Sequence, residues 1–346
     1  MNLSILLSFF LGIYIPIVAF GQNATSSASG NKYKIVDKVL KSKQRVLGGD
    51  VCLLIYKDGK IILERDLGNF TKYTSAPVAS CSKWFTAALA MTFIDAGLIS
   101  PDDTIGKYLP VFTKYHKGFI TIRQCLSHTT GVESEQINLW TLLELRKYNS
   151  LADEVNNFAL KPLAGQPGKV FGYSSVGLNI VGRIMELVSE KDFESIFQEY
   201  IAKPLGMKNT TFSKTKAVNP SGGAYSTASD YMNFLSMILN KGVCKGKRII
   251  SPEAINEMQI SRTAGLKIIY TPPQTEGYEY AYGEWILEKD KNGNSNVISS
   301  PGLFGTFPYL VKSRNYAAII FVRNLQFMNR QSTYNEIINA INQAVK

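Results

Sequence analysis

The sequence is poor in the residues that metal and cofactor sites use. Its 346 residues include only two histidines and four cysteines, and the cysteines form no CxxC pair. HExxH, GxxxxGK and GxGxxG patterns are also missing, so we expect no metal and no cofactor. No GxSxG elbow is present, which argues against the common Ser-His-Asp hydrolase arrangement. A nucleophile in this chain would need another means of activation.

Acidic residues are outnumbered, with 38 Lys+Arg against 27 Asp+Glu, a formal net charge of +11. The basic residues are scattered along the chain rather than clustered, so we expect no nucleic-acid partner. A generally basic surface would suit association with an anionic cell envelope. The charge pattern leaves the oligomeric state open.

The first 21 residues carry no charged side chain. Residues 3–20 are apolar apart from a break at Pro16, and small residues at Ala19 and Gly21 precede a polar stretch. This pattern predicts a signal peptide over 1–21 and a linker over 22–31. An uncleaved membrane anchor is the alternative, because the stretch approaches the length of a span. Both interpretations predict an exported protein, periplasmic or secreted.

Strand patterns occur at both ends of the remaining chain, and helical patterns fill its middle. We expect helices over 32–46, 83–98 and 331–345, and strands over 50–57, 60–66, 281–288, 307–313 and 316–324. The Asp58-Gly59 pair predicts a hairpin turn. These patterns favour an α/β (α+β) fold: one antiparallel sheet built from both chain ends and flanked by helices, with an inserted helical domain. The predicted domain covers 32–346, with a sheet lobe of about 32–83 and 220–346 and a helical lobe of about 84–219.

Ser80-Cys81-Ser82-Lys83 is an S-x-x-K tetrad at the start of a long apolar helix. Residues three apart on a helix share a face, so Lys83 would reach the Ser80 hydroxyl. Backbone N–H groups in the first turn lack intrahelical partners and could stabilise an oxyanion. Burial and the positive helix end would lower the pKa of Lys83. The tetrad alone equally fits a helix-capping serine followed by a surface lysine.

Two further elements precede predicted secondary structure. Tyr173, within Phe171–Gly177, stands just before an apolar helix, and an ammonium beside it would lower its pKa and let it act as a base. Ser299–Gly305 is rich in glycine and precedes a strand, where a substrate could approach the backbone closely. In isolation, these elements also fit a packing tyrosine and a glycine-rich turn.

The order and spacing of the three elements resemble the serine β-lactamase and penicillin-binding protein superfamily. The match is closest to class C β-lactamases, D-aminopeptidases and related esterases, and runs over about 32–346. Further matching stretches are Lys57–Lys60, Ile105–Pro110, Leu126–Gly131, Gln166–Gly168, Lys203–Met207 and Gly222–Asp230. The resemblance implies a β-lactamase/transpeptidase-like fold.

The resemblance also implies a role for each matched position. Ser80 would be the acylated nucleophile, and Lys83 and Tyr173 would handle protons, with either of them as the base. The backbone N–H groups of Ser80 and Leu303 would form the oxyanion hole. Ser175, Ser300 and Gly302 would line the substrate site.

Two positions depart from the superfamily's pattern. Ser175 stands where an asparagine is usual, which weakens the grip on a substrate amide carbonyl. Ser300, followed by Pro301, replaces the usual Lys or His, which removes a cation expected to meet a substrate carboxylate. We therefore expect an exported serine hydrolase with esterase-like specificity that acts on a small ester, amide or peptide.

Two alternative functions remain open from the sequence. One is a β-lactamase or D,D-peptidase that acts on β-lactams or cell-wall peptides, in which Lys312 or Arg323 would supply the missing cation. The other is a catalytically idle sensor or binding protein of penicillin-binding type, which Ser175 and Ser300 favour slightly. We interpret His128, Cys81 and Asp230 as structural: a histidine satisfied by loop backbone, a core residue and part of a helix cap.

Overall fold

The computed structural model describes residues 32–134, 148–324 and 330–345. The predicted signal peptide (1–21) and linker (22–31) lie outside the described residues. Within those ranges, no helix has both the length and the apolar character needed to span a bilayer.

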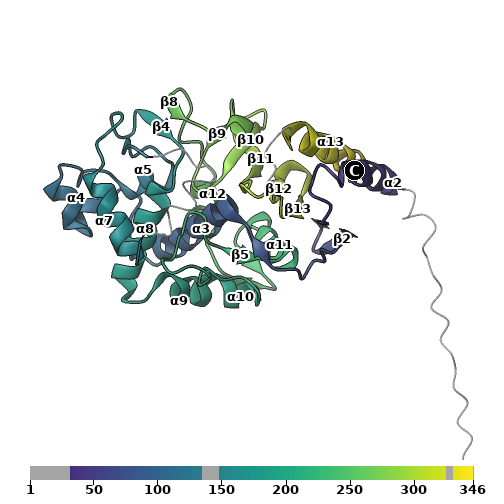
Figure 1. The fold of residues 1–346 in the computed structure, drawn as a ribbon, viewed down its shortest axis with the longest axis horizontal. Helices are drawn as coiled ribbons and strands as arrows, with labels where there is room; N and C mark the ends of the chain where they lie inside the picture. The colour runs from purple at the N-terminus through teal and green to yellow at the C-terminus, as the bar shows by residue number, and fades with distance from the viewer. Residues whose placement is uncertain (1–31, 135–147, 325–329, 346) are drawn as a thin grey trace, which may run out of the picture.

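A seven-stranded antiparallel sheet joins the two ends of the chain (Figure 1). Its order is β2-β1-β13-β12-β11-β10-β9, so the N-terminal hairpin pairs with the last strand of the chain. The strands are β1 (Val51–Lys57), β2 (Lys60–Leu67), β9 (Glu279–Tyr280), β10 (Trp285–Lys289), β11 (Ser295–Ser299), β12 (Phe307–Val311) and β13 (Tyr316–Val322). The predicted turn at Asp58-Gly59 is confirmed, with both residues at positive φ.

The strand expected over 281–288 is wrong at its start. Backbone pairing stops after Tyr280 and resumes at Trp285, with Gly283 at a φ of +75° between them. A Cβ at Gly283 would lie 2.6 Å from the Lys83 carbonyl oxygen, so the turn is pressed against the helix that follows Ser80. Residues 281–284 therefore form the turn between the antiparallel strands β9 and β10, and this turn meets the S-x-x-K segment.

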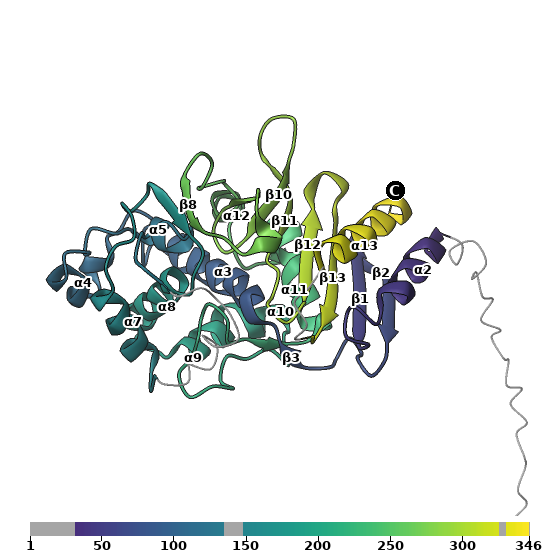
Figure 2. The same ribbon diagram turned by 45° about the horizontal axis from the view of Figure 1, so that its top comes forward.

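Each face of the sheet packs against its own helices because strand residues alternate in direction. Val51, Leu53 and Ile55 of β1 join the cluster that contains α2 and α13 residues. Cys52 and Leu54 face the larger cluster, which includes α3 and α11. Helices α2 (Lys34–Lys43) and α13 (Arg330–Ala344) lie side by side on one face, as Figure 2 shows.

Most helices between β2 and β9 in the sequence lie to one side of the sheet in Figure 2, whereas α11 packs against β1 and β13. The helix α3 (Ser82–Asp95) runs through the core and is buried on all sides over most of its length. The remaining helices are α4 (Pro110–Lys114), α5 (Ile122–Leu126), α7 (Leu151–Leu160), α8 (Val176–Ser189), α9 (Phe193–Phe197), α10 (Lys203–Leu205), α11 (Ala228–Leu239) and α12 (Pro252–Met258). The fold class predicted from the sequence is confirmed.

Three two-stranded sheets complete the described part of the fold. They pair β3 (Ala76–Pro77) with β5 (Tyr225–Ser226), β4 (Val170–Gly172) with β8 (Lys267–Tyr270), and β6 (Val243–Cys244) with β7 (Lys247–Arg248). The first two sheets flank the functional elements, because β3 precedes Ser80 and β4 precedes Tyr173. The four cysteines are free and buried.

Candidate active site

Ser80 lies in a tight turn that runs directly into α3. Residues Ala79–Cys81 form a single 3-10 turn, and Ala79 has a φ of +48°, a strained value for a residue with a Cβ. The turn is secured by hydrogen bonds from Cys81 N to Val78 O (3.2 Å) and from Ser82 Oγ to Ala79 O (2.6 Å). The fold therefore maintains a strained backbone at the residue before the candidate nucleophile.

Lys83 lies one helical turn from Ser80 and is 1% exposed. Its Nζ donates to Ser80 Oγ at 3.3 Å and to the Ser221 carbonyl oxygen at 2.9 Å. Burial lowers the pKa of Lys83 to about 7. The expected contact and the expected direction of the pKa shift are both confirmed, so a large fraction of the amine is neutral at pH 7.

Tyr173 joins the same cluster from the opposite side. Lys83 Nζ lies 4.8 Å from the centroid of its ring, and its hydroxyl interacts with the Ser80 and Trp285 side chains. The rings of Tyr280 and Trp285 pack against it at centroid distances of 5.8 Å and 5.2 Å. The structure thus brings together the three side chains predicted from distant parts of the sequence.

The expected lowering of the Tyr173 pKa is wrong. Burial raises the pKa of this phenol, and the hydrogen bond with Ser80 offsets the rise only in part. The ring is buried among aromatic side chains, and an amine with a pKa of about 7 is only partly protonated at neutral pH and offers limited stabilisation to a phenolate. Tyr173 is therefore protonated at neutral pH, and Lys83 is the better placed proton acceptor in the resting site.

The glycine element lies directly against the turn that carries Ser80. A Cβ on Gly302 would lie 2.3 Å from the Val78 carbonyl oxygen. Hydrogen bonds from Gly302 N to Thr306 O (2.8 Å) and from Gly305 N to Gly302 O (2.9 Å) close the loop on itself. This tight loop sets the position of Leu303, the predicted second oxyanion donor.

Ser175 and Ser300, the two residues that depart from the superfamily's pattern, have different surroundings. The Ser300 side chain is buried, and its Oγ lies 2.9 Å from the Gly283 carbonyl oxygen and 3.4 Å from that of Ser80. This hydroxyl secures the loop against the turn before Trp285 and the turn that carries Ser80. Ser175 is partly exposed at the start of α8, and its side chain makes no hydrogen bond within the described residues.

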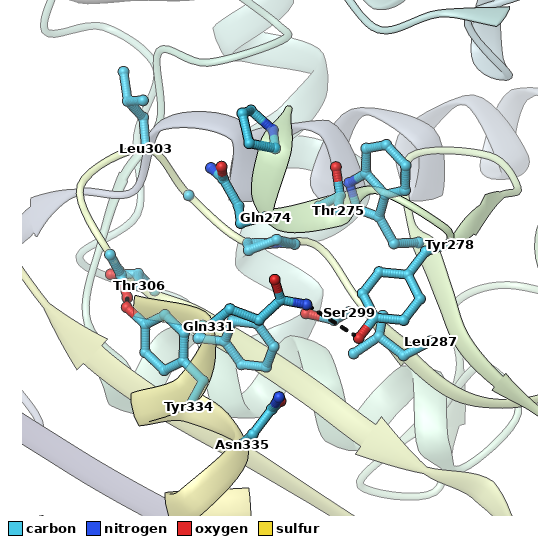
Figure 3. A pocket seen from close by; sticks show the side chains of 16 residues that line it. Gln274, Thr275, Tyr278, Leu287, Ser299, Leu303, Thr306, Gln331, Tyr334 and Asn335 are labelled. Carbon is cyan, nitrogen blue, oxygen red and sulfur yellow. Dashed lines mark hydrogen bonds between the residues drawn. The ribbon is translucent and has the colours of Figure 1, made fainter. Parts of the chain in front are cut away.

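A pocket of about 280 Å³ lies beside the glycine element (Figure 3). Gly302 and Leu303 line it, as does Trp285, which also packs on Tyr173, whereas Ser80, Lys83 and Tyr173 are not among its lining residues. Its lining residues are Pro273, Gln274, Thr275, Tyr278, Trp285, Leu287, Ser299, Pro301, Gly302, Leu303, Gly305, Thr306, Phe307, Gln331, Tyr334 and Asn335. Within the described part of the chain, this lining is aromatic, aliphatic and amide in character, and none of its residues is charged.

The two cations considered for carboxylate recognition lie in different places. Lys312 Nζ donates to Gln259 Oε1 (2.9 Å) and Ser295 Oγ (3.1 Å), at the end of β11 opposite the glycine element. Arg323 is exposed just after β13, and the neighbouring Asn324 N donates to Phe304 O at 2.8 Å. Of the two, Arg323 follows the strand end that adjoins the glycine element.

His128 and Asp230 have structural surroundings. His128 is buried beside the Tyr173 and Tyr280 rings, and its Nδ1 accepts from the backbone N of Ser174 at 3.5 Å, but its Nε2 has no partner within the described residues, so the loop backbone satisfies only one of its two nitrogens. Thr227 caps α11 by accepting from Asp230 N, whereas the Asp230 carboxylate accepts from Asn209 N at 2.7 Å. In residues 32–134, 148–324 and 330–345, no three His, Cys, Asp or Glu side chains gather as metal ligands would.

Sequence reasoning missed the residues behind Lys83. The amine donates to a backbone oxygen, that of Ser221, and Asn179 and Glu154 lie beyond it. Every residue has a backbone carbonyl, so a pattern of side chains cannot reveal which one accepts the hydrogen bond. The only available signal was the position of Ser221 directly before Gly222–Asp230, one of the stretches that carry the resemblance.

The sheet, the inserted helices and the S-x-x-K turn between them define a β-lactamase/transpeptidase-like protein. Residues 36–340 match the model of the Beta-lactamase family. The chain therefore belongs to the β-lactamase family, within the superfamily of serine β-lactamases and penicillin-binding proteins, whose members are generally hydrolytic serine enzymes.

Similar proteins include enzymes of different specificity. D-alanyl-D-alanine-carboxypeptidase/endopeptidase AmpH of Escherichia coli (strain K12) is 23% identical over 302 residues, which cover 76% of this chain and 75% of AmpH. A structure from Bacteroides dorei DSM 17855, provisionally described as a β-lactamase, has a TM-score of 0.80 and 28% identity, covering 90% of this chain and 98% of that one. A family VIII carboxylesterase has a TM-score of 0.73 at 16% identity, covering 90% and 97%, and this likeness shows the fold alone.

Proposed function

We propose that this protein is a serine hydrolase that forms an acyl-enzyme on Ser80. The observation that carries the proposal is the position of the Lys83 amine, 3.3 Å from Ser80 Oγ and 4.8 Å from the centre of the Tyr173 ring. A hydroxyl is a weak nucleophile until a neighbouring base takes its proton, and a buried amine with a pKa of about 7 can do so at neutral pH.

In acylation, neutral Lys83 takes the Ser80 proton as Oγ attacks the substrate carbonyl. The carbonyl oxygen becomes an oxyanion and is stabilised by the Ser80 and Leu303 N–H groups. The protonated Tyr173 hydroxyl gives its proton to the leaving group, the bond to that group breaks, and Lys83 returns a proton to Tyr173. In deacylation, a water molecule loses a proton to the same pair and attacks the acyl carbonyl, and Ser80 leaves with a proton restored.

We propose neutral esters with an apolar or aromatic group as the favoured substrates. The uncharged pocket beside Leu303 supports this choice, because Tyr278, Trp285 and Phe307 offer aromatic surface to a substrate group. Ser175 and Ser300 support it as well, because neither supplies the amide or the cation that a peptide or β-lactam would meet. The place of a Gly302 side chain is taken by the Val78 carbonyl, so Gly302 would offer only its backbone to the substrate.

A D,D-peptidase or β-lactamase activity is the second candidate, and the similarity to AmpH favours it. In that case Arg323 is the better placed of the two cations to meet a substrate carboxylate, because Lys312 is already bound by Gln259 and Ser295. We also propose that residues 1–21 direct export and that residues 32–346 form the hydrolase domain, with sheet and helical lobes divided as predicted.

A substrate panel on the purified chain without residues 1–21 tests the proposal. It compares p-nitrophenyl acetate, a p-nitrophenyl ester of an aromatic acid, a chromogenic cephalosporin and a D-Ala-D-Ala peptide, with Ser80→Ala as the control. We expect Ser80-dependent turnover of both esters and weak turnover of the cephalosporin. Cephalosporin turnover equal to that of the esters would overturn the ester preference, and the absence of any turnover would favour an idle binding protein.

A further inference from the structure

A chain of hydrogen bonds leads from the helical lobe to the Lys83 amine. Lys83 Nζ donates to the Ser221 carbonyl at 2.9 Å. The Ser221 backbone N–H donates to Asn179 Oδ1, also at 2.9 Å, and has a longer contact of 3.2 Å with Asn219 Oδ1. The Asn179 Nδ2 in turn donates to Glu154 Oε2 at 3.0 Å. The chain therefore links α7, α8 and the segment after Pro220 to the catalytic helix α3.

The Asn179 side chain has one orientation that satisfies both of its neighbours. Its Oδ1 faces a backbone donor and its Nδ2 faces a carboxyl oxygen, so a flipped amide would place donor against donor and acceptor against acceptor. Asn179 is 0% exposed and Glu154 is 2% exposed, so water cannot replace either bond. The amide therefore fixes the Ser221 N–H relative to α7 and α8.

The segment that carries Ser221 is also bonded to α3 on both sides. Thr86 Oγ1 donates to Pro220 O at 2.6 Å, and Ala224 N donates to Ser82 Oγ at 3.0 Å. Asn179 holds the middle of this segment from the direction opposite to α3. The Ser221 carbonyl is therefore fixed where it accepts from the amine.

Burial of the Glu154 carboxyl destabilises the fold more than a purely structural contact would require. Its Oε1 has no partner within the described residues, and burial raises the pKa of its carboxyl to about 7. A buried polar atom without a partner destabilises a fold, and this carboxyl bonds the asparagine that reaches the Ser221 segment. Glutamine at this position would offer the same acceptor without the burial of an ionisable group.

We propose that Asn179 and Glu154 are positioning residues for Lys83. By fixing the Ser221 carbonyl, they hold the amine between Ser80 and Tyr173 in the orientation that proton transfer requires. This inference rests on the proposed function, because the position of the amine matters only if Lys83 exchanges the Ser80 proton. Neither residue touches the substrate.

Three variants of the full domain test the inference, with p-nitrophenyl acetate as substrate. In Asn179→Leu, the Ser221 N–H loses its closest acceptor and keeps only the 3.2 Å contact with Asn219 Oδ1. We expect kcat to fall about tenfold or more, as is typical when groups behind a catalytic residue are removed, with a much smaller change in KM. The weaker carbonyl contact stabilises the ammonium less, so the acidic limb of the pH profile moves to lower pH.

The other two variants exchange donor and acceptor. In Asn179→Asp, the introduced carboxylate faces Glu154, so activity is low and recovers as the pH falls and one shared proton restores a donor. The double variant combines Asn179→Asp with Glu154→Gln. Its glutamine amide donates to the introduced carboxylate, which still accepts from Ser221 N, so the acid pair is replaced by a donor and an acceptor. We expect the double variant to recover part of the wild-type kcat, most fully at pH values where the introduced carboxyl, whose pKa burial raises, is ionised.

Gln198→Leu is the matched control. Its amide donates to Thr210 O at 2.8 Å in the same lobe but has no bond to the Ser221 segment. An Asn179→Leu variant with wild-type kcat and pH profile would overturn the inference, as would an equal loss of kcat in both leucine variants at matched melting temperature. A folded double variant without recovery would also overturn it.

The failure of this inference can be distinguished from the failure of the proposed function. The rate at which a fluorophosphonate labels Ser80 is measured in every variant beside ester turnover. If the wild-type chain neither turns over the ester nor takes the label, the proposed function is overturned and this inference with it. If the wild type does both and Asn179→Leu does so equally well, this inference alone is overturned.

Discussion

Gly302 lies so close to Val78 that a Cβ on the glycine would be 2.3 Å from the Val78 carbonyl oxygen. This contact joins the loop after β11 to the backbone just before Ser80. It sets how near the Leu303 backbone can come to the candidate nucleophile. An oxyanion hole needs two donors at fixed positions, so the missing side chain at residue 302 is part of the site's geometry.

Gly302→Ala is therefore expected to damage both stability and activity. The methyl group must displace backbone, which we expect to cost about 1–3 kcal/mol of unfolding free energy. Denaturant unfolding and kcat for p-nitrophenyl acetate measure the two effects. Gly172→Ala is the control for stability, because its Cβ would meet nothing closer than 3.9 Å. An unchanged kcat in Gly302→Ala would contradict the assigned role of this loop.

The pH profile of acylation should follow the Lys83 amine. Its pKa is lowered to about 7, so the neutral base form is scarce at pH 6 and dominant at pH 8. We expect kcat/KM for p-nitrophenyl acetate to rise through pH 7 and then level. Lys83→Met should lose most of the activity, and the rise of kcat/KM through pH 7 should disappear with it. A wild-type profile that is flat between pH 6 and pH 8 would show that another group is the base.

The pocket beside Leu303 should distinguish aromatic from small acyl groups. Tyr278→Ala removes an aromatic wall, and we expect kcat/KM for the aromatic ester to fall about tenfold while that for the acetate changes little. The ratio of the two specificity constants is the measurement. Tyr73→Ala, at an exposed position, is the control. If kcat/KM fell equally for both esters, the acyl group would not bind in this pocket.

Glu284 should make the protein less stable as the pH rises. It is fully buried, so burial raises its pKa well above the usual range, and the nearby Lys312 and Trp84 side chains offset the rise only in part. The folded state therefore binds a proton that the unfolded chain releases above about pH 4.5. Stability is greatest below that pH and is lost as the pH rises toward the folded-state pKa.

Glu284→Gln removes this titration. We expect urea unfolding to show a gain on the order of 1–3 kcal/mol over the wild type at pH 8, and a smaller difference at pH 5. Glu253→Gln, at an exposed position, should leave the pH dependence unchanged. If the Glu284→Gln difference were the same at both pH values, Glu284 would be paired or ionised in the folded state.

Local patterns predicted part of the site because they act over a few residues. The three-residue spacing of Ser80 and Lys83 fixes their contact on any helix, and Asp58-Gly59 fixes the first hairpin. The pKa of Tyr173 could not be predicted in the same way, because it depends on Tyr280 and Trp285, which come from another part of the chain. Strand β11 was missed because Ser295, Asn296 and Ser299 are polar yet buried.

The central claim is that Ser80 is an activated nucleophile, and covalent labelling tests it most directly. The purified chain without residues 1–21 is incubated with a fluorophosphonate, digested and examined by mass spectrometry. We predict one adduct, on the peptide that contains Ser80, which forms faster at pH 8 than at pH 6 and is absent from Ser80→Ala. No adduct, or an adduct that persists in Ser80→Ala, would contradict the account.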